Sequence, residues 1–308
     1  MKTEGKYIKE NVYEYHYHYK MKIITSVVNS TDFIEIQHRT LQKYFKGQYE
    51  FIVFNDAKEF NDVTNGGDLT IKTKIRETCR ALNIVCIDVA NDHHRTMNMS
   101  DRHADTFNNN VLAYQLKNPD KYLLLDSDMF LIDHFDLAKY EPFDCAIVLQ
   151  SRNVSTHYFW PGLCYLDFTK IKHQELLDWR CGHGCDSGGM MKDWLSVQMG
   201  NIPFPTTEEI RWTTEKVFHT KNIYFIKHLW SCSWSESELP ETLTNNAPLV
   251  HFITQDSRNV NGKYFCEMYD GVFLHYRAGG NWLEEGMDLH RANSAKLKQI
   301  LFDACGST

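Results

Sequence analysis

Apolar runs of strand length alternate with segments of helical periodicity over residues 21–132, and this alternation constrains the fold more than any other feature. Strands are predicted at 21–30, 49–56, 84–92 and 121–132, and helices at 31–47, 69–83 and 100–118. This order favours right-handed crossovers and a mostly parallel sheet, which binds ligands at the carboxyl ends of its strands. We therefore predict an α/β, Rossmann-like fold with helices flanking a central sheet.

The pattern changes near residue 140 into mixed, aromatic-rich segments, among which 161–168 predicts a strand and 190–198 a helix. No repeat, low-complexity linker or charge run divides the chain, so one domain is expected. The expected divisions are an N-terminal extension at 1–20 and a domain at 21–308, with halves of about 21–135 and 136–308.

Composition and charge exclude several functions. The chain has 33 Lys and Arg against 40 Asp and Glu, and a net charge of −7 disfavours a nucleic-acid or anionic-membrane binder. No apolar stretch approaches the ~18 residues that span a bilayer, and the N-terminus lacks the apolar core of a secretory signal. The nine cysteines form no CxxC pair and indicate reduced thiols, so a cytoplasmic protein is expected. Cys181, His183 and Cys185 suggest a metal site only weakly, because nothing indicates a fourth zinc ligand.

The most informative segment is LLLDSDMFLI, in which Asp126 and Asp128 leave an apolar strand together. Two like charges at the end of a buried strand are costly unless something compensates them. A divalent cation provides that compensation, and carboxylate oxygens suit Mg²⁺ or Mn²⁺. The alternative is that one carboxylate caps a turn while the other faces water.

This segment resembles the DxD motif of GT-A-fold glycosyltransferases, which follows a hydrophobic strand in their nucleotide-binding half. The resemblance covers about 21–285 and includes two further segments, GLCYLDF to CDSGG and FLHYRAGGNW. It implies a GT-A-type domain whose first half binds the nucleotide and whose second half binds the acceptor. It also implies that Asp128 holds Mn²⁺ or Mg²⁺ against the diphosphate of a UDP- or GDP-sugar. Asp126 would reach the metal or the ribose, and Ser127 would lie near the sugar.

The resemblance assigns donor contacts to polar residues on the helical segment before the motif and at the ends of the first two strands. They are Arg102, His103 and Asn110 on the helical segment, Asn55 and Asp56 after the second strand, and Thr25 and Ser26 on the first. A solvated helix face or ordinary turn chemistry is the alternative for each of them.

The segment CDSGG precedes the helix predicted at 190–198. Asp186 and Ser187 are compatible with an N-cap, whereas two glycines in a first turn destabilise a helix and indicate a close approach. The resemblance implies that Asp186 binds acceptor or sugar hydroxyls or is the catalytic base of an inverting enzyme. The predicted acceptor or sugar contacts around it are Gly162, Ser187, Gly188 and Gly189, and the competing bases are Asp167, Asp193 and Glu208.

The segment FLHYRAGGNW at 273–282 follows a strand-like run. In many GT-A enzymes a late histidine completes the metal coordination and a glycine-containing loop closes over the diphosphate. The resemblance therefore assigns His275 to the metal, Arg277 and Gly280 to the donor, and Asn281 and Trp282 to the acceptor or sugar. Arg277 would replace the lysine of the best-known version, HFxGxxKPW, as a phosphate clamp.

Together these features predict a metal-dependent hexosyl- or pentosyltransferase that moves a sugar from its donor to a hydroxyl of a glycan or related acceptor. A sugar-1-phosphate nucleotidyltransferase would need a Gly-rich, Arg-containing loop after the first strand, and VVNSTDF is not one. A haloacid-dehalogenase phosphatase would carry its Asp pair after the first core strand. A catalytically silent nucleotide-sugar-binding protein stays open, as do His251 for the third ligand position and a purely structural His275.

Overall fold

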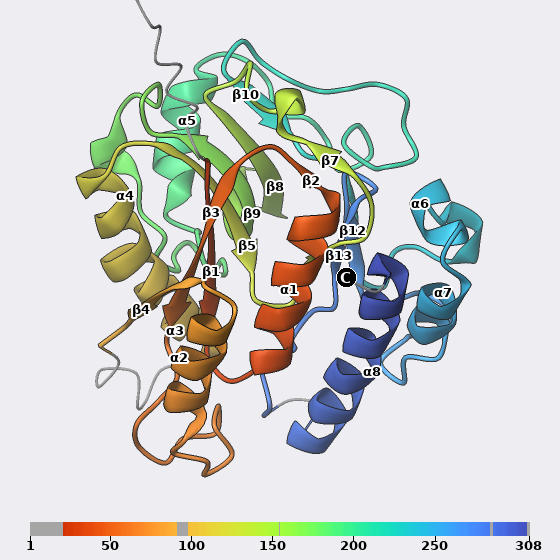
Figure 1. The fold of residues 1–308 in the computed structure, drawn as a ribbon. Coiled ribbons are helices and arrows are strands. Elements are labelled where there is room, and N and C mark those ends of the chain that lie inside the picture. Colours follow the sequence, from red (N-terminus) through yellow and green to blue (C-terminus); the bar gives the residue numbers. More distant parts are fainter. Residues whose placement is uncertain (1–20, 91–97, 154, 284–285, 307–308) are drawn as a thin grey trace, which may run out of the picture.

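Four parallel strands from the first part of the chain lie side by side in the central sheet, as the alternation predicts. The computed structural model describes residues 21–90, 98–153, 155–283 and 286–306, so the predicted extension at 1–20 lies outside the described residues. The seven strands follow the order β10-β8-β9-β5-β1-β3-β4, and only β9 runs antiparallel to its neighbours. A mostly parallel sheet flanked by helices is therefore confirmed (Figure 1). Both predicted halves contribute strands to it, and the division between them stays a prediction.

The strands belong to three sheets. The central sheet contains β1 (Met21–Val27), β3 (Tyr49–Asn55), β4 (Val85–Asp88), β5 (Lys121–Asp126), β8 (Cys145–Asn153), β9 (Thr156–Asp167) and β10 (Ile223–Phe225). A small antiparallel sheet contains β11 (His228–Leu229), β12 (Glu267–Tyr269), β13 (Phe273–His275) and β6 (Met129–Leu131). The third is the short pair β2 (Phe45–Lys46) and β7 (Phe135–Asp136).

The helices surround these sheets. They are α1 (Thr31–Tyr44), α2 (Ile71–Ala81), α3 (Met99–Thr106), α4 (Ala113–Lys117), α5 (Met191–Met199), α6 (Glu241–Thr244), α7 (Ala247–Thr254) and α8 (Met287–Cys305). Among the described residues, no helix combines the length and the apolarity that a membrane crossing requires.

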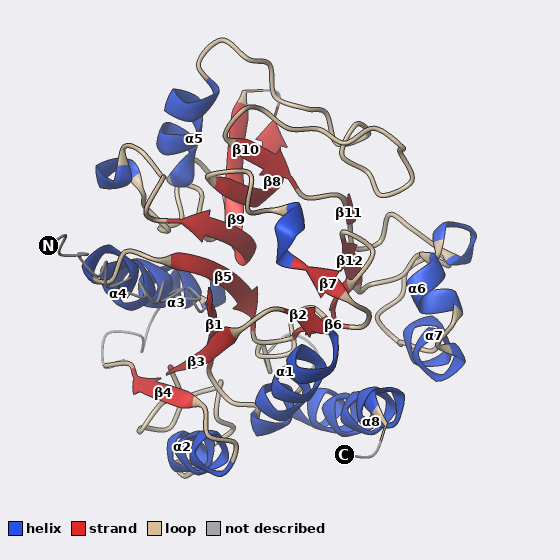
Figure 2. Ribbon diagram, turned by 45° about the horizontal axis from the view of Figure 1, so that its top comes forward, coloured by secondary structure: helices blue, strands red, loops and turns tan. Residues whose placement is uncertain are grey.

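Apart from the edge strand β4, whose residues are exposed or half-buried, both faces of the central sheet are buried, which explains the continuous apolar runs of its strands. On β1, Ile23 packs in one cluster with residues of α1 and α2, and its neighbour Ile24 packs in another with residues of the helical segment 99–117 and α5. Figure 2 shows α2 on one side of the sheet and α3 and α4 on the other. A third cluster joins α1 to α7, α8 and the small sheet.

Several element boundaries differ from the sequence prediction. The first helix ends at Tyr44 instead of residue 47, and Ser30 caps it by accepting a hydrogen bond from the N–H of Phe33. The helix predicted at 100–118 is interrupted by a π-helical stretch at Phe107–Leu112. The strand predicted at 121–132 is divided into β5 and β6, which belong to different sheets.

Candidate metal centre and adjoining cavities

The carboxylate pair lies where the chain leaves the central sheet for the small one. β5 ends at Asp126, in register with Ser26 of β1, and β6 begins at Met129. The side-chain amide of Gln37 on α1 donates to the carbonyl oxygens of Asp126 (2.7 Å) and Met129 (3.1 Å). Gln37 therefore fixes both sides of the crossing that carries Asp126 and Asp128.

His275 reaches this crossing through the small sheet, because β13 pairs with β6 so that His275 lies opposite Met129. Its Nε2 lies 3.1 Å from Oδ1 of Asp128 and 3.8 Å from Oδ2 of Asp126. One possible ligand atom of each residue lies within 4.8 Å of the others, and no other such group of His, Cys, Asp or Glu occurs among the described residues. The fold thus brings the predicted triad together, whereas His251 lies exposed on α7.

A further carboxylate orients the imidazole. Nδ1 of His275 lies 2.8 Å from Oε2 of Glu267 on β12, and the same oxygen accepts from the hydroxyl of Tyr269 (2.7 Å). A carboxylate on one imidazole nitrogen fixes the ring and directs the other nitrogen to a metal. Sequence reasoning missed Glu267, although an acidic residue between the apolar Cys266 and Met268 was a signal for it.

The charges of this group shift one another's pKa values. Burial alone would lower the pKa of His275, but Asp128 and Glu267 raise it to about 10. Burial would raise the pKa of Asp128, but His275 and the N–H of Gly279 lower it. The pKa of Asp126 is raised, first by burial and then by the Asp128 charge. The site therefore favours a positive charge between the carboxylates.

This arrangement fits a divalent metal ion. Two carboxylates and one imidazole form a ligand set that Mn²⁺ accepts. The second oxygen of Asp128 accepts from the N–H of Gly279 (2.7 Å), while Oδ1 lies beside His275. The side chain of Asp126 keeps 21% of its surface exposed and lines two cavities, so a substrate can approach the ligand group.

The first of these cavities is a narrow pocket of about 150 Å³ next to β1 and α3. The predicted site residues that line it, besides Asp126 and Asp128, are Ser26, Asp56, Arg102, His103, Ser127, Gly280 and Asn281. Sequence reasoning missed other residues of its wall, which are Val28, Lys58, Thr64, Met99 and Ala278.

Charged side chains in this pocket are fixed by protein partners. Arg102 forms a two-point salt bridge with Asp62, with distances of 2.6 and 2.8 Å. The buried Lys58 donates to Oδ1 of Asp56 (2.9 Å), and the other Asp56 oxygen accepts from the hydroxyl of Thr106 (2.9 Å). The pocket wall is therefore polar and preorganised.

A wider cavity of about 750 Å³ opens on the other side of the carboxylate pair. Asp126, His103 and Asn281 line both cavities, so the group of Asp126, Asp128 and His275 lies at their boundary. The wide cavity also contains Asp186, Ser187 and Arg277 on its walls, together with aromatic residues, which are Tyr158, Trp160, Trp230 and Phe265. Ser187 Oγ lies 3.1 Å from Nδ1 of His103 and so connects the two sides.

The four candidate bases occupy different places. Asp186 is exposed and lines the wide cavity. Asp193 and Glu208 are exposed but line neither cavity, and Asp167 is buried at the end of β9 and bonded to Thr169. Among these four, the geometry therefore favours Asp186.

Several predicted substrate contacts line neither cavity; they are Thr25, Asn55, Asn110, Gly162, Gly188, Gly189 and Trp282. Thr25 is buried in β1 between β3 and β5. Asn55 donates to the carbonyl of Lys72 and to Asp88, and Trp282 is buried with Arg291 stacked 5.0 Å from its ring centre. These contacts are internal to the protein, so the geometry lends no support to substrate roles for these residues.

The close approach indicated by the CDSGG glycines is made by the protein's own backbone. Gly188 has a φ of +85°, and a Cβ atom there would lie 2.2 Å from the carbonyl oxygen of Phe159. A Cβ on Gly189 would lie 2.6 Å from the carbonyl oxygen of Gly182. The helix that follows begins at Met191 with Met190 in the N-cap position, so the N-cap interpretation of Asp186 and Ser187 is wrong.

Gly162 has a similar internal reason. It lies within β9, which begins at Thr156 instead of Pro161, and a Cβ there would lie 2.0 Å from ring atoms of Trp160. The missing side chain lets the indole lie against the strand, with its centre 5.1 Å from that of His275. Gly162 thus shapes the wall of the wide cavity indirectly.

Comparison with known proteins finds structural likeness without sequence relatives. Neither a scan of protein-family models nor a search of curated protein sequences gives a match. The chain is similar to the mannosyltransferase Ktr4p from S. cerevisiae, with 11% identity and a TM-score of 0.36 over 51% of this chain and 58% of that chain. It is also similar to core-mannan synthase A (CmsA/Ktr4) from Aspergillus fumigatus in its Mn/GDP form, with 12% identity and a TM-score of 0.33. That match covers 49% of this chain and 60% of the other, so the chain spans less than two thirds of either structure's length.

At such low identities and TM-scores, the function has to be argued from the site itself.

Gly188→Ala is expected to lower the free energy of unfolding by more than about 2 kcal/mol, because it adds a backbone clash to the strain of a positive φ. Urea denaturation measures this loss. The matched control is Gly184→Ala, where φ is +70° but nothing lies within 4 Å of the new Cβ, and about 1 kcal/mol is expected. Equal losses in the two variants would contradict the explanation.

The affinity for Mn²⁺ is expected to rise about tenfold per pH unit near neutrality, because His275, with a pKa raised to about 10, has to lose its proton to bind a metal. The neutral fraction of the imidazole grows with pH as long as the pH stays below this pKa. Calorimetric titration in buffers of different ionisation enthalpy measures both the affinity and the release of one proton per metal. An affinity independent of pH is the contrary result.

Proposed function

We propose that this chain is a metal-dependent glycosyltransferase that transfers a sugar from a UDP- or GDP-sugar to a hydroxyl of a glycan or related acceptor. The observation that carries the proposal is the position of Asp126, Asp128 and His275 at the boundary between a narrow pocket and a wide cavity. A donor needs its nucleoside on one side of the metal and its sugar, next to the acceptor, on the other. A cytoplasmic location stays a prediction.

The three side chains would hold Mn²⁺ or Mg²⁺ through one carboxylate oxygen each and Nε2 of His275. When bound, such an ion neutralises the charge that builds on a departing nucleoside diphosphate. Glu267 holds the imidazole in the orientation that this role needs, and Gly279 holds Asp128. Both supports are present before any ligand binds, which limits the entropy lost on binding.

The narrow pocket suits the nucleoside part of the donor. Its wall offers Ser26, Asp56 and Arg102 as polar contacts, close to the carboxylates that would face the phosphates. Arg277 lies on the opposite, wide side, where its NH1 donates to Ser231 Oγ (3.0 Å) and its guanidinium can bind a diphosphate oxygen. Nε2 of His103 lies 4.0 Å from Oδ1 of Asp126. His103 would therefore contact the donor between the nucleoside in the narrow pocket and the diphosphate oxygen bound by Arg277.

Asp186 is the best candidate for the base. Three carboxylates line the wide cavity, and two of them, Asp126 and Glu267, already interact with His275. The exposed carboxylate of Asp186 accepts from the N–H of Ser187 (2.7 Å), which fixes its position on the wall. It would accept the proton of the acceptor hydroxyl as that oxygen attacks the anomeric carbon.

Thermal-shift measurements distinguish this proposal from its alternatives. Stabilisation by UDP or GDP that requires Mn²⁺, followed by slow hydrolysis of the matching nucleotide sugar, supports a glycosyltransferase. Stabilisation by a nucleoside triphosphate instead would indicate a nucleotidyltransferase. The β1–α1 loop, where such an enzyme would bind the triphosphate, does not favour this alternative, because the side chain of Asn29 there already donates to the carbonyl oxygens of Thr64 and Gly280. Binding without any turnover would indicate a silent binding protein.

Asp128→Ala is expected to weaken nucleotide-dependent Mn²⁺ binding by more than about 100-fold, because it removes a ligand and the partner of His275. Electron paramagnetic resonance of free Mn²⁺ measures the affinity, and circular dichroism checks the fold. The control is Asp133→Ala, just after β6, which should bind as the wild type does. Unaltered Mn²⁺ affinity in Asp128→Ala would refute the assignment.

Asp186→Asn is expected to lower kcat about 10²–10⁴-fold while donor affinity stays within about twofold, because the amide cannot take up a proton. Asp193→Asn, an exposed aspartate of the nearby α5 that lines neither cavity, is the matched control. Steady-state kinetics with calorimetric donor binding separates the two effects. Near-normal turnover in Asp186→Asn eliminates this residue as the base.

A further inference from the structure

The loop that follows β13 adopts a backbone conformation that its residues disfavour. Arg277 and Ala278 have φ angles of +67° and +58°, and residues with side chains keep such a left-handed conformation only where the surrounding structure holds them. The loop nevertheless delivers two hydrogen bonds to Asp128. The N–H of Tyr276 donates to its carbonyl oxygen (2.9 Å), and the N–H of Gly279 to its carboxylate (2.7 Å).

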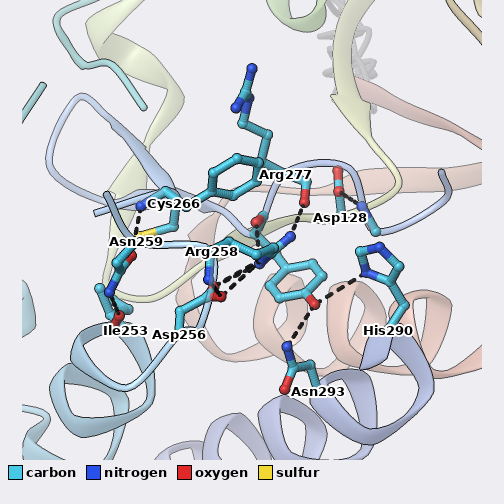
Figure 3. A network of polar contacts seen from close by, with 12 residues as sticks. Asp128, Ile253, Asp256, Arg258, Asn259, Cys266, Arg277, His290 and Asn293 are labelled. Atoms are coloured by element: carbon cyan, nitrogen blue, oxygen red, sulfur yellow. Dashed lines mark hydrogen bonds and ion pairs between the residues drawn. The ribbon is translucent and has the colours of Figure 1, made fainter. Parts of the chain in front are cut away.

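A buried guanidinium holds this loop from behind. Arg258 donates from NH1 to the carbonyl oxygen of Arg277 (2.8 Å) and from NH2 to that of Tyr276 (3.1 Å). Its Nε and NH2 also donate to the two oxygens of Asp256, at 2.9 and 2.7 Å. Figure 3 shows the guanidinium of Arg258 between Asp256 and the loop, with the side chain of Arg277 pointing away from this guanidinium.

The guanidinium is itself tightly fixed. The side chain of Arg258 is 3% exposed, and its charged centre lies 4.1 Å from the ring centre of Tyr276 and 4.5 Å from that of Phe265. The next residue, Asn259, donates to the carbonyl oxygen of Ile253 at the end of α7 (2.9 Å). Burial would lower the pKa of Arg258, but Asp256 raises it, so the group stays charged.

We infer that Arg258 is a positioning residue of the metal centre, which holds the 276–279 loop in the conformation that orients Asp128 and projects Arg277 into the wide cavity. The inference rests on the proposed function, because the loop positions a metal ligand and a donor-binding arginine only if the chain binds a metal and a nucleotide sugar. Arg258 lines neither cavity and would contact no substrate, so it acts only through the loop. The guanidinium of Arg258 donates to two consecutive carbonyl oxygens and to one carboxylate at the same time. A lysine ammonium cannot make these hydrogen bonds with the same planar geometry.

Arg258→Lys tests the inference, with Arg211→Lys as its matched control. Arg211 is also a largely buried arginine that bonds a carboxylate, Glu238, and a backbone carbonyl oxygen, that of Ser233, but it does not contact the loop. Hydrogen exchange of the metal-free proteins reports on the amide of Gly279, and titration with Mn²⁺ plus UDP or GDP reports on the metal centre. Melting temperatures show whether both variants lose comparable stability.

In Arg258→Lys we expect peptides that cover 276–281 to exchange faster, and the Mn²⁺ affinity to fall about tenfold, as for the loss of one charged hydrogen bond. Arg211→Lys should change neither. Added guanidinium ion should restore Mn²⁺ affinity to Arg258→Ala, and an added alkylammonium ion should not. This rescue would not be expected if Arg258 served stability alone.

Unchanged exchange at 276–281, or unchanged Mn²⁺ affinity in Arg258→Lys while the wild type binds Mn²⁺, overturns the positioning role and leaves the proposed function intact. If the wild type itself binds no Mn²⁺ with either nucleotide, the proposed function fails and this inference fails with it.

Discussion

Two carboxylates at the end of a buried strand repel each other, and the site is built around this repulsion. Asp126 and Asp128 lie two residues apart where the chain crosses between sheets, and each disfavours the charge of the other. A positive group has to lie beside them. Within the protein that group is the imidazole of His275, which the small sheet brings to 3.1 Å from Asp128. A metal ion can take over the same task.

Much of the surrounding structure keeps these three groups in place. Gln37 fixes the crossing from α1, Glu267 orients the imidazole from β12, and the 276–279 loop holds Asp128 from the far side. The supports come from α1, from β12 of the small sheet and from the loop that follows β13. Such a framework positions ligand atoms before binding, as a metal centre requires. It also divides the space around the carboxylates into a narrow pocket and a wide cavity.

Local patterns made the parallel strands and the triad predictable. The strands read as apolar runs because both faces of the sheet are buried, and Asp126, Asp128 and His275 lie in short segments that resemble a known motif. Contacts made outside these motif segments were not predictable. Glu267 and Arg258 act through partners that only folding brings near. The two adjacent glycines Gly188 and Gly189 indicate a close approach, but the sequence is the same whether a ligand or the protein backbone makes that approach. Thr25 shares β1 with the pocket residue Ser26, and Asn110 lies in the π-helical stretch that follows α3, but neither lines a cavity.

A crystal grown with Mn²⁺ and a nucleoside diphosphate, measured at the manganese absorption edge, would locate the metal and the nucleotide. We expect one anomalous peak per chain, coordinated by Asp128, His275 and the diphosphate, with the nucleoside in the narrow pocket. A peak elsewhere, or a bound nucleotide remote from the two carboxylates, would contradict this expectation.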